Sequence, residues 1–137
     1  MAKALAALAV VLLLSPQPDA QAIHDTHLMA QLVYHEARGE CFDGQVAVAE
    51  VVLNRVASPL FPNTIEEVVM QRTGRVWQFS PAPYIDKAKP GPMQYNAVLT
   101  AMREHERVVS EDSLYFSMAP YNSKITAHIG CHWFCKE

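Results

Sequence analysis

The stretch Thr26–Gly39, THLMAQLVYHEARG, decides the fold of the first part of the chain. Asp25 and Thr26 are good helix caps at one end, and Gly39 can end a helix in the left-handed conformation at the other. Between them the apolar side chains recur every three or four residues, as on the buried face of an α-helix: Leu28, Met29, Leu32, Val33 and Ala37. We therefore expect a helix over 26–38.

Glu36 lies on this same apolar face, because it follows Leu28 and Leu32 at a spacing of four residues. A carboxylate on a buried helix face is costly unless it is paired or protonated. Burial would raise its pKa, which is what a general acid working near neutral pH requires. The pattern leaves two interpretations open: a catalytic acid, or a structural carboxylate paired with Arg38, Arg55 or a buried tyrosine.

The rest of the chain predicts helices first and strands mostly later, with no internal repeat and no domain linker. The expected helices cover 45–57, about 65–71 and 93–109, and a loop covers 84–92. The expected strands cover 75–80, 113–117 and 126–134. This order predicts an α+β fold, a compact single domain of about four helices with a small antiparallel sheet formed mostly by the C-terminal part.

Composition restricts the function classes. The 137 residues include 50% hydrophobic ones, which suits one folded domain and not a disordered chain. The 11 Lys and Arg residues are outnumbered by 14 Asp and Glu residues, for a net charge of −3. Nucleic-acid binding depends on a basic surface, so we expect no nucleic-acid partner. We also expect the protein to be a monomer.

The first 22 residues have the layout of a secretory signal peptide. Lys3 precedes the apolar run 4–14, and Ala20-Gln21-Ala22 forms an A-x-A cleavage site. Eleven residues rise only about 16 Å as a helix, well short of the roughly 30 Å hydrocarbon core, so no stable membrane span is expected. We predict a signal peptide over 1–22, a single domain over 23–137, and export to the periplasm, cell wall or medium.

Three cysteines, Cys41, Cys131 and Cys135, lie in the part expected to be exported. An oxidising compartment permits a disulfide, and an odd number allows at most one within the chain. We expect a bridge from Cys41 to Cys131 or Cys135, since sequence does not fix the pairing. His128 and His132 add to this cluster, but the spacing is not that of a zinc site, and no metal is expected.

Other catalytic motifs are weak in this chain. Neither His35-Glu36 nor His105-Glu106 begins an H-E-x-x-H motif, and G-x-S-x-G is absent. Cys41 with a distant histidine leaves a thiol hydrolase as a thin alternative. As a set, the aromatic residues suit a sugar-binding groove near a carboxylate: Trp77, Phe79, Tyr84, Tyr115 and Trp133.

Several runs of residues, in this order, resemble the SleB/CwlJ-type cell-wall hydrolases. The most specific are YHEARGE at 34–40, GQVAVA at 44–49 and VLNRV at 52–56. Shorter matches follow: FPNT at 61–64, VV at 68–69, QFS at 78–80 and I-G-x-H-x-F at 129–134. The resemblance spans about residues 27–137.

The resemblance implies a lysozyme-like domain, similar to lytic transglycosylases, that cleaves peptidoglycan glycan strands without a cofactor. The catalytic acid of the family maps onto Glu36, the residue that the helix pattern indicates independently. Gln78, Ser80 and His132 match further motif positions. The expected substrate-binding set adds two aromatics to these: Gln78, Phe79, Ser80, Tyr115 and His132.

Two reactions remain possible at the glycosidic bond between N-acetylmuramic acid and N-acetylglucosamine. Glu36 alone can serve as acid and then as base toward the C6 hydroxyl, as in a lytic transglycosylase, which we favour. A muramidase needs a second carboxylate, for which Glu40 is the nearest candidate and Glu50 a more remote one. A third alternative is a secreted wall-binding module without turnover.

Overall fold

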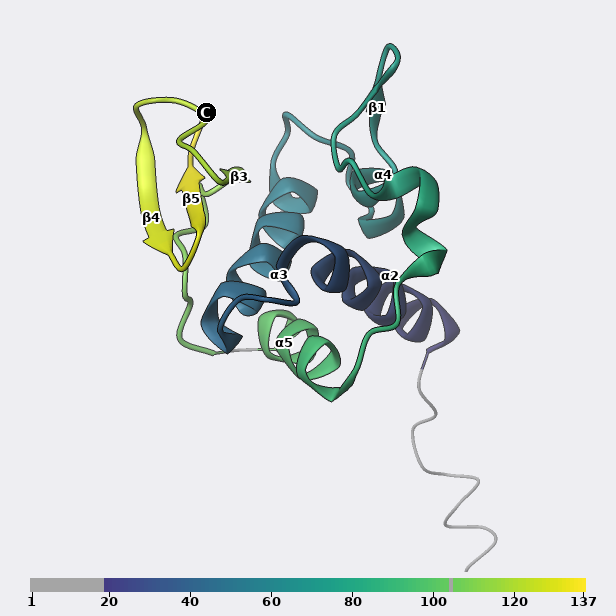
Figure 1. Cartoon of the computed structure of the whole chain (residues 1–137). Coiled ribbons are helices and arrows are strands. Elements are labelled where there is room, and N and C mark those ends of the chain that lie inside the picture. The colour runs from purple at the N-terminus through teal and green to yellow at the C-terminus, as the bar shows by residue number, and fades with distance from the viewer. Residues whose placement is uncertain (1–18, 104) are drawn as a thin grey trace, which may run out of the picture.

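Residues 19–103 and 105–137 are described by a computed structural model (Figure 1). Its helices are α2 (Ala20–Ala37), α3 (Phe42–Ala57), α4 (Ile65–Val69), the 3-10 helix η1 (Ala82–Lys87) and α5 (Pro92–Met102). Its strands are β1 (Arg72–Thr73), β2 (Val76–Trp77), β3 (Tyr115–Ser117), β4 (Ile125–Ile129) and β5 (His132–Cys135). All strand pairs are antiparallel, and the C-terminal sheet has the order β3-β5-β4. The predicted α+β class is confirmed.

Helix α3 is the centre of the core. It packs against α2, α4 and α5, and almost every side chain between Gly44 and Val52 is buried. Burial on all faces is typical of a fully enclosed helix, and the many Ala and Val side chains of α3 let the neighbours approach closely, although α3 also buries polar side chains such as Gln45 and Glu50. Figure 1 shows the C-terminal sheet beside α3 on one side of the molecule and the β1–β2 hairpin projecting near α4.

The ends of two predicted helices are wrong. Helix α2 begins at Ala20 and not at Thr26, because the side chain of Asp19 accepts a hydrogen bond from the Gln21 N–H and acts as the cap. Helix α5 ends at Met102 and not near 109. The chain leaves the helix there, and the backbone N–H groups of Val108 and Val109 donate to the buried carboxylate of Glu50.

The strand predictions need similar corrections. The strand expected over 75–80 is a short hairpin over 72–77 that turns at Gly74 (φ 61°). The loop expected over 84–92 contains most of η1. The strand expected over 126–134 is broken at Gly130 (φ 57°) into β4 and β5. The positive φ favours glycine at this position, and a side chain there would also displace the carboxylate of Glu40.

The N-terminal prediction is only partly covered by the structure. Most of the predicted signal peptide, residues 1–18, lies outside the described residues. The predicted cleavage point after Ala22 falls in the first turn of α2. Between 19 and 137, leaving aside residue 104, no helix has the length and hydrophobicity needed to cross a membrane.

Candidate active site

Glu36 lies in the last turn of α2, half-buried, at the junction of two clefts. The first cleft, of about 320 Å³, is lined by Glu36, Arg55, Trp77, Gln78, Phe79, Ser80, Phe116, Ser117, Met118 and His132. The second, of about 410 Å³, is lined by His35, Glu36, Ala37, Arg38, Gly39, Glu40, Met118, Cys131 and His132. Because Glu36, Met118 and His132 line both clefts, open space continues on two sides of the carboxyl group. An extended polymer could therefore pass over it.

The surroundings of Glu36 favour its protonated form. Burial raises the pKa of Glu36 above its ordinary value, and the positive charge of Arg55 partly opposes this effect. A carboxyl group that stays protonated close to neutral pH can donate a proton to a bound substrate. The arrangement therefore gives Glu36 the property expected of a general acid.

Arg55 also lines the first cleft, although the sequence suggested it only as a structural partner of Glu36. Its side chain is 4% exposed, and its Nε donates to the carbonyl oxygen of Leu114 at 2.8 Å. The guanidinium lies over three aromatic rings, at 4.8 Å from the centre of Phe61, 4.7 Å from Phe79 and 5.5 Å from Tyr115. Burial lowers the pKa of Arg55 to about 10, which still leaves it charged at neutral pH.

Four of the five predicted substrate-binding residues line the first cleft with Glu36. Gln78 and Ser80 are exposed, and Phe79 is buried beneath Arg55. His132 is 5% exposed, with its ring 5.2 Å from that of Phe116 in an edge-on contact. Burial lowers the pKa of His132 and so favours its neutral form.

Tyr115 is the predicted residue that lines neither cleft. Its ring stacks on Tyr121 at 4.4 Å, and its hydroxyl donates to the carboxylate of Glu137. Burial and this hydrogen bond raise the pKa of Tyr115 to about 12. Tyr115 therefore lies behind Arg55 and supports the site from below.

Glu40, the possible second carboxylate, lines only the second cleft. Its two oxygens accept from the backbone N–H of Cys131 at 3.2 and 3.3 Å, and one of them lies 3.9 Å from Nδ1 of His132. The Glu40 side chain thereby holds the β4–β5 turn against the end of α2. Glu50, the more remote candidate, is fully buried and lines neither cleft.

All three cysteines are free thiols in the structure. Cys41 and Cys131 are exposed, whereas Cys135 is buried with its sulfur 3.8 Å from the carbonyl oxygen of Asn122. Cys41 is the N-cap residue of α3 and directly follows Glu40, whose carboxylate holds the Cys131 backbone. Among the described residues, no group of three or more His, Cys, Asp or Glu side chains is arranged to hold a metal ion.

Four further residues of the first cleft were not proposed as site residues from the sequence: Trp77, Phe116, Ser117 and Met118. Trp77 was noted only as one of a set of aromatics, and nothing in its local pattern separates a cleft position from a core position. Met118 is 69% exposed although it is apolar. Its position between the two clefts depends on the fold of the loop after β3, for which the sequence carries no signal.

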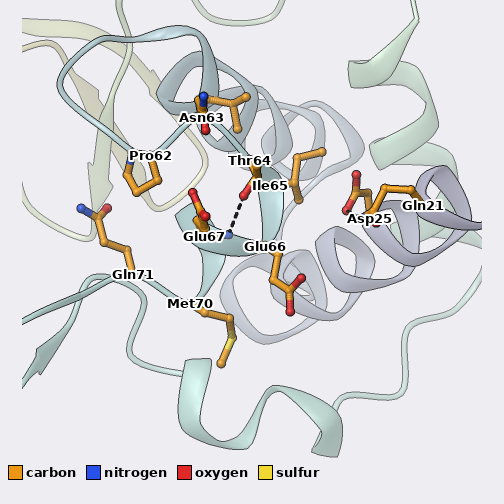
Figure 2. A pocket seen from close by; sticks show the side chains of 11 residues that line it. Gln21, Asp25, Pro62, Asn63, Thr64, Ile65, Glu66, Glu67, Met70 and Gln71 are labelled. Carbon is orange, nitrogen blue, oxygen red and sulfur yellow. Dashed lines mark hydrogen bonds between the residues drawn. The ribbon is translucent and has the colours of Figure 1, made fainter.

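A larger cleft of about 940 Å³ lies between α2 and α4 (Figure 2). Figure 2 shows Gln21 and Asp25 of α2 on one side of the cleft and Ile65 and Glu66 of α4 on the other, with Thr64 accepting a hydrogen bond from the Glu67 N–H. This cleft shares no lining residue with the two clefts at Glu36. None of the predicted site residues lies in it.

The fold and the site together define a class: a small α+β domain with one desolvated carboxyl group in an open groove. The family described as Cell Wall Hydrolase matches residues 39–135, and the chain belongs to this family. The predicted resemblance to SleB-type proteins is confirmed by relatives and by solved structures. The family match begins three residues after Glu36.

Two curated relatives are spore cortex-lytic enzymes. The protein from Bacillus subtilis (strain 168) is 36% identical over 120 residues, covering 82% of this chain and 38% of the relative. The protein from Oceanobacillus iheyensis is 34% identical over 133 residues, covering 87% of this chain and 44% of the relative. The chain therefore spans less than half the length of these relatives.

Two solved structures share the fold. The catalytic domain of the germination-specific lytic transglycosylase SleB from Bacillus anthracis has a TM-score of 0.71 and 33% identity, covering 88% of this chain and all of that domain. The catalytic domain of the Bacillus cereus SleB protein has a TM-score of 0.68 and 34% identity, covering 87% of this chain and 94% of that one. The described chain thus corresponds to a whole catalytic domain of these proteins.

Proposed function

We propose that this domain cleaves the glycan strands of peptidoglycan as a lytic transglycosylase, with Glu36 as the general acid and base. The observation that carries the proposal is the position of Glu36, half-buried where two open clefts meet. The likeness to a catalytic domain named a lytic transglycosylase supports it. The bond to be cleaved joins N-acetylmuramic acid to N-acetylglucosamine.

In the first step, protonated Glu36 donates its proton to the glycosidic oxygen as that bond breaks, and positive charge develops at the muramic acid ring. In the second step, the Glu36 carboxylate takes the proton of the C6 hydroxyl, whose oxygen bonds to C1. The product is a 1,6-anhydro sugar, and Glu36 is protonated again. The attacking oxygen belongs to the same ring, so its effective concentration is high without a bound water.

The contacts of the other carboxylates support this route over that of a muramidase. A two-carboxylate mechanism needs a second free carboxylate across the scissile bond. Both oxygens of Glu40 are engaged by the Cys131 N–H, and Glu50 lies away from both clefts. Neither is well placed to activate a water.

The walls of the first cleft suggest how sugar rings would bind. Gln78 and Ser80 offer exposed polar groups for hydroxyl and acetamido groups, and Trp77 lines the cleft beside them. His132 lies at the junction beside Glu36, and Tyr115 acts through Arg55 without touching the glycan. We propose a monomer with peptidoglycan as its macromolecular partner.

We further propose export, with cleavage of the signal peptide after Ala22. Cleavage would remove three residues of α2 and leave its buried positions intact, because the first of them is Leu28. The layout of residues 1–22 supports this step, and a substrate outside the membrane requires it.

Within the exported protein we propose a disulfide between Cys41 and Cys131, formed by thiol exchange with an oxidised dithiol catalyst. Both thiols are exposed, on segments joined by the Glu40–Cys131 hydrogen bonds, whereas Cys135 is buried in the core. The bridge would close a loop of about 90 residues, and disulfides typically contribute about 2–4 kcal/mol. Peptide mapping of exported protein should find this link in the wild type and in Cys135→Ser, and three free thiols would contradict it.

Digestion of purified peptidoglycan, followed by mass spectrometry of the products, tests the proposed reaction. A lytic transglycosylase gives 1,6-anhydromuramic ends, which are lighter than hydrolysed ends by one water, about 18 Da. Reducing muramic ends alone would identify a muramidase. Binding without any product, from a folded protein, would identify a wall-binding module.

A further inference from the structure

One buried nitrogen of Arg55 has no hydrogen-bond partner among the residues that the structure describes. Nη1 is buried and makes no hydrogen bond, although Nε of the same guanidinium is bound to Leu114. Leaving a buried, charged N–H unpaired costs more than leaving a neutral one. A group kept in this state in the free protein is suited to a partner that forms only during the reaction.

The position of Arg55 indicates what that partner is. Arg55 and Glu36 line the same cleft, and each charge affects the other, yet the two side chains form no direct ion pair. The rings of Phe61, Phe79 and Tyr115 hold the guanidinium in place. A direct contact would keep Glu36 ionised and remove the proton that the first step needs.

The other groups near Glu36 are less suited to balance a new negative charge. From β5, His132 is held toward its neutral form by burial. After the end of α2, Glu40 is itself acidic, and Arg38 lies over the ring of Tyr34, 5.0 Å from its centre, and donates to the Tyr34 carbonyl oxygen. From β3 and the loop that follows it, Tyr115 and Tyr121 lie close enough to the guanidinium for their charges to influence it. Arg55 is thus the cation best placed to act on Glu36.

We propose that Arg55 is a positioning residue for Glu36, and that its free Nη1 group stabilises the Glu36 carboxylate after the proton has been donated. This proposal rests on the proposed function of Glu36. In the resting protein no ion pair joins the two groups, and burial favours the protonated form of Glu36. After the first step, the new negative charge faces a preorganised donor, and the carboxylate is held ready to take the C6 hydroxyl proton.

Two substitutions of Arg55 separate this role from simple packing. Arg55→Met keeps an apolar stem among the three rings and removes the charge, and Arg55→Lys restores a charge. We expect Arg55→Met to lower kcat about 10-fold or more with little change in KM, which is the pattern of an interaction made in the transition state. Because the lowering influence on the Glu36 pKa is lost, the alkaline limb of the kcat–pH profile should move to higher pH, by about 0.5–1 unit.

The matched controls are Arg38→Met, which removes a cation of the second cleft, and Arg55→Lys. Arg38→Met should leave the alkaline limb where it is in the wild type, and Arg55→Lys should return the limb toward that position. A loss of kcat with the limb unmoved, and with Arg55→Lys no better than Arg55→Met, would overturn the proposal and make Arg55 a packing residue.

A second measurement needs no change at Arg55 and does not depend on activity. The guanidinium ¹⁵N shifts of Arg55 should titrate with Glu36 in the wild-type protein, and this titration should vanish in Glu36→Gln. Arg55 shifts that are insensitive to pH in the wild type would overturn the proposal. If the titration is present but no glycan product forms, the proposed function fails and the coupling of the two residues stands.

Discussion

The carboxylates of Glu36 and Glu50 lie on neighbouring helices, both within apolar sequence, and have opposite surroundings. Glu50 is fully buried and accepts hydrogen bonds from Val108 and Val109, with Nε2 of His105 2.5 Å from one oxygen. Glu36 is half-buried, faces two clefts and has no hydrogen-bond partner among the described residues that favours its ionised form.

The difference shows that burial by itself does not make a catalytic acid. A buried carboxylate that is surrounded by donors has its hydrogen bonds satisfied and anchors the chain around it, as Glu50 anchors the segment after α5. A partly buried carboxyl group without such donors keeps its proton and can give it away. Only the second environment is useful for acid catalysis.

The largest expected effect is the loss of activity in Glu36→Gln. The amide keeps the shape of the side chain but carries no proton that it can donate, so glycan cleavage should fall at least about 100-fold. Because Glu36 has no donors to lose, the free energy of unfolding should stay the same or rise slightly. Product release from peptidoglycan and thermal unfolding measure the two quantities.

Glu66→Gln is a matched control, because it makes the same change at an exposed carboxylate of α4. It should retain full activity. If Glu36→Gln keeps more than about a tenth of the wild-type rate while it folds normally, Glu36 is not the acid.

The reverse outcome is expected for Glu50→Gln. The amide can accept only part of the hydrogen bonds that the carboxylate accepts, and its NH₂ group would face the Val108 and Val109 N–H groups. We expect the free energy of unfolding to fall by about 2 kcal/mol, since hydrogen bonds to a charged group contribute about 1.5–3 kcal/mol each. Urea denaturation measures this change, and the specific activity of the folded fraction should stay close to that of the wild type. An unchanged urea midpoint would contradict the anchoring role.

Stability should also depend on pH through His105. The hydrogen bond with the Arg103 carbonyl, and then that with Glu50, raises the pKa of His105. A group with a raised pKa in the folded state contributes stability that is fully present below its unfolded pKa, about 6.5, and is lost as pH rises through the folded value. The wild-type melting temperature should therefore decline as pH rises above about 6.5, and this decline should be weaker in Glu50→Gln. If the melting temperatures of the wild type and of Glu50→Gln change by the same amount from pH 5.5 to 8.5, the proposed contribution of the His105–Glu50 contact is wrong.

The sequence could predict Glu36 as a candidate but not its contrast with Glu50. The apolar period of α2 and the YHEARGE run both indicate Glu36, and the order of helices and strands predicts the α+β class. Glu50 also lies on an apolar helix, in the run VAVAEVVL at 46–53. What separates the two is the path of residues 105–109, which supply donors to one carboxylate and not to the other.

The missed parts of the site have a similar cause. Arg55 follows Glu36 by nineteen positions, on another helix, and its role depends on rings from three separate segments. The predicted start of α2 is wrong because the side chain of Asp19 caps the helix earlier. The predicted end of α5 is wrong because the chain leaves the helix at Met102 and its later N–H groups bind the distant Glu50 carboxylate. Local patterns predict which face of an element is buried, but not which distant group completes its hydrogen bonds.

Among the carboxylates that line the two clefts, the smaller effect on activity is expected for Glu40→Gln, because Glu40 combines features of Glu36 and of Glu50. Glu40 lines the second cleft like a catalytic residue, yet its oxygens bind the Cys131 N–H like a structural one. The amide oxygen of glutamine can still accept from that N–H, so activity should stay within about threefold of the wild type and the products should keep their 1,6-anhydro ends. Glu40→Ala removes the acceptor and should lower the melting temperature by several degrees, because the β4–β5 turn loses its contact with the end of α2. A loss in Glu40→Gln as large as that in Glu36→Gln, with reducing ends in the digest, would instead make Glu40 the second carboxylate of a muramidase.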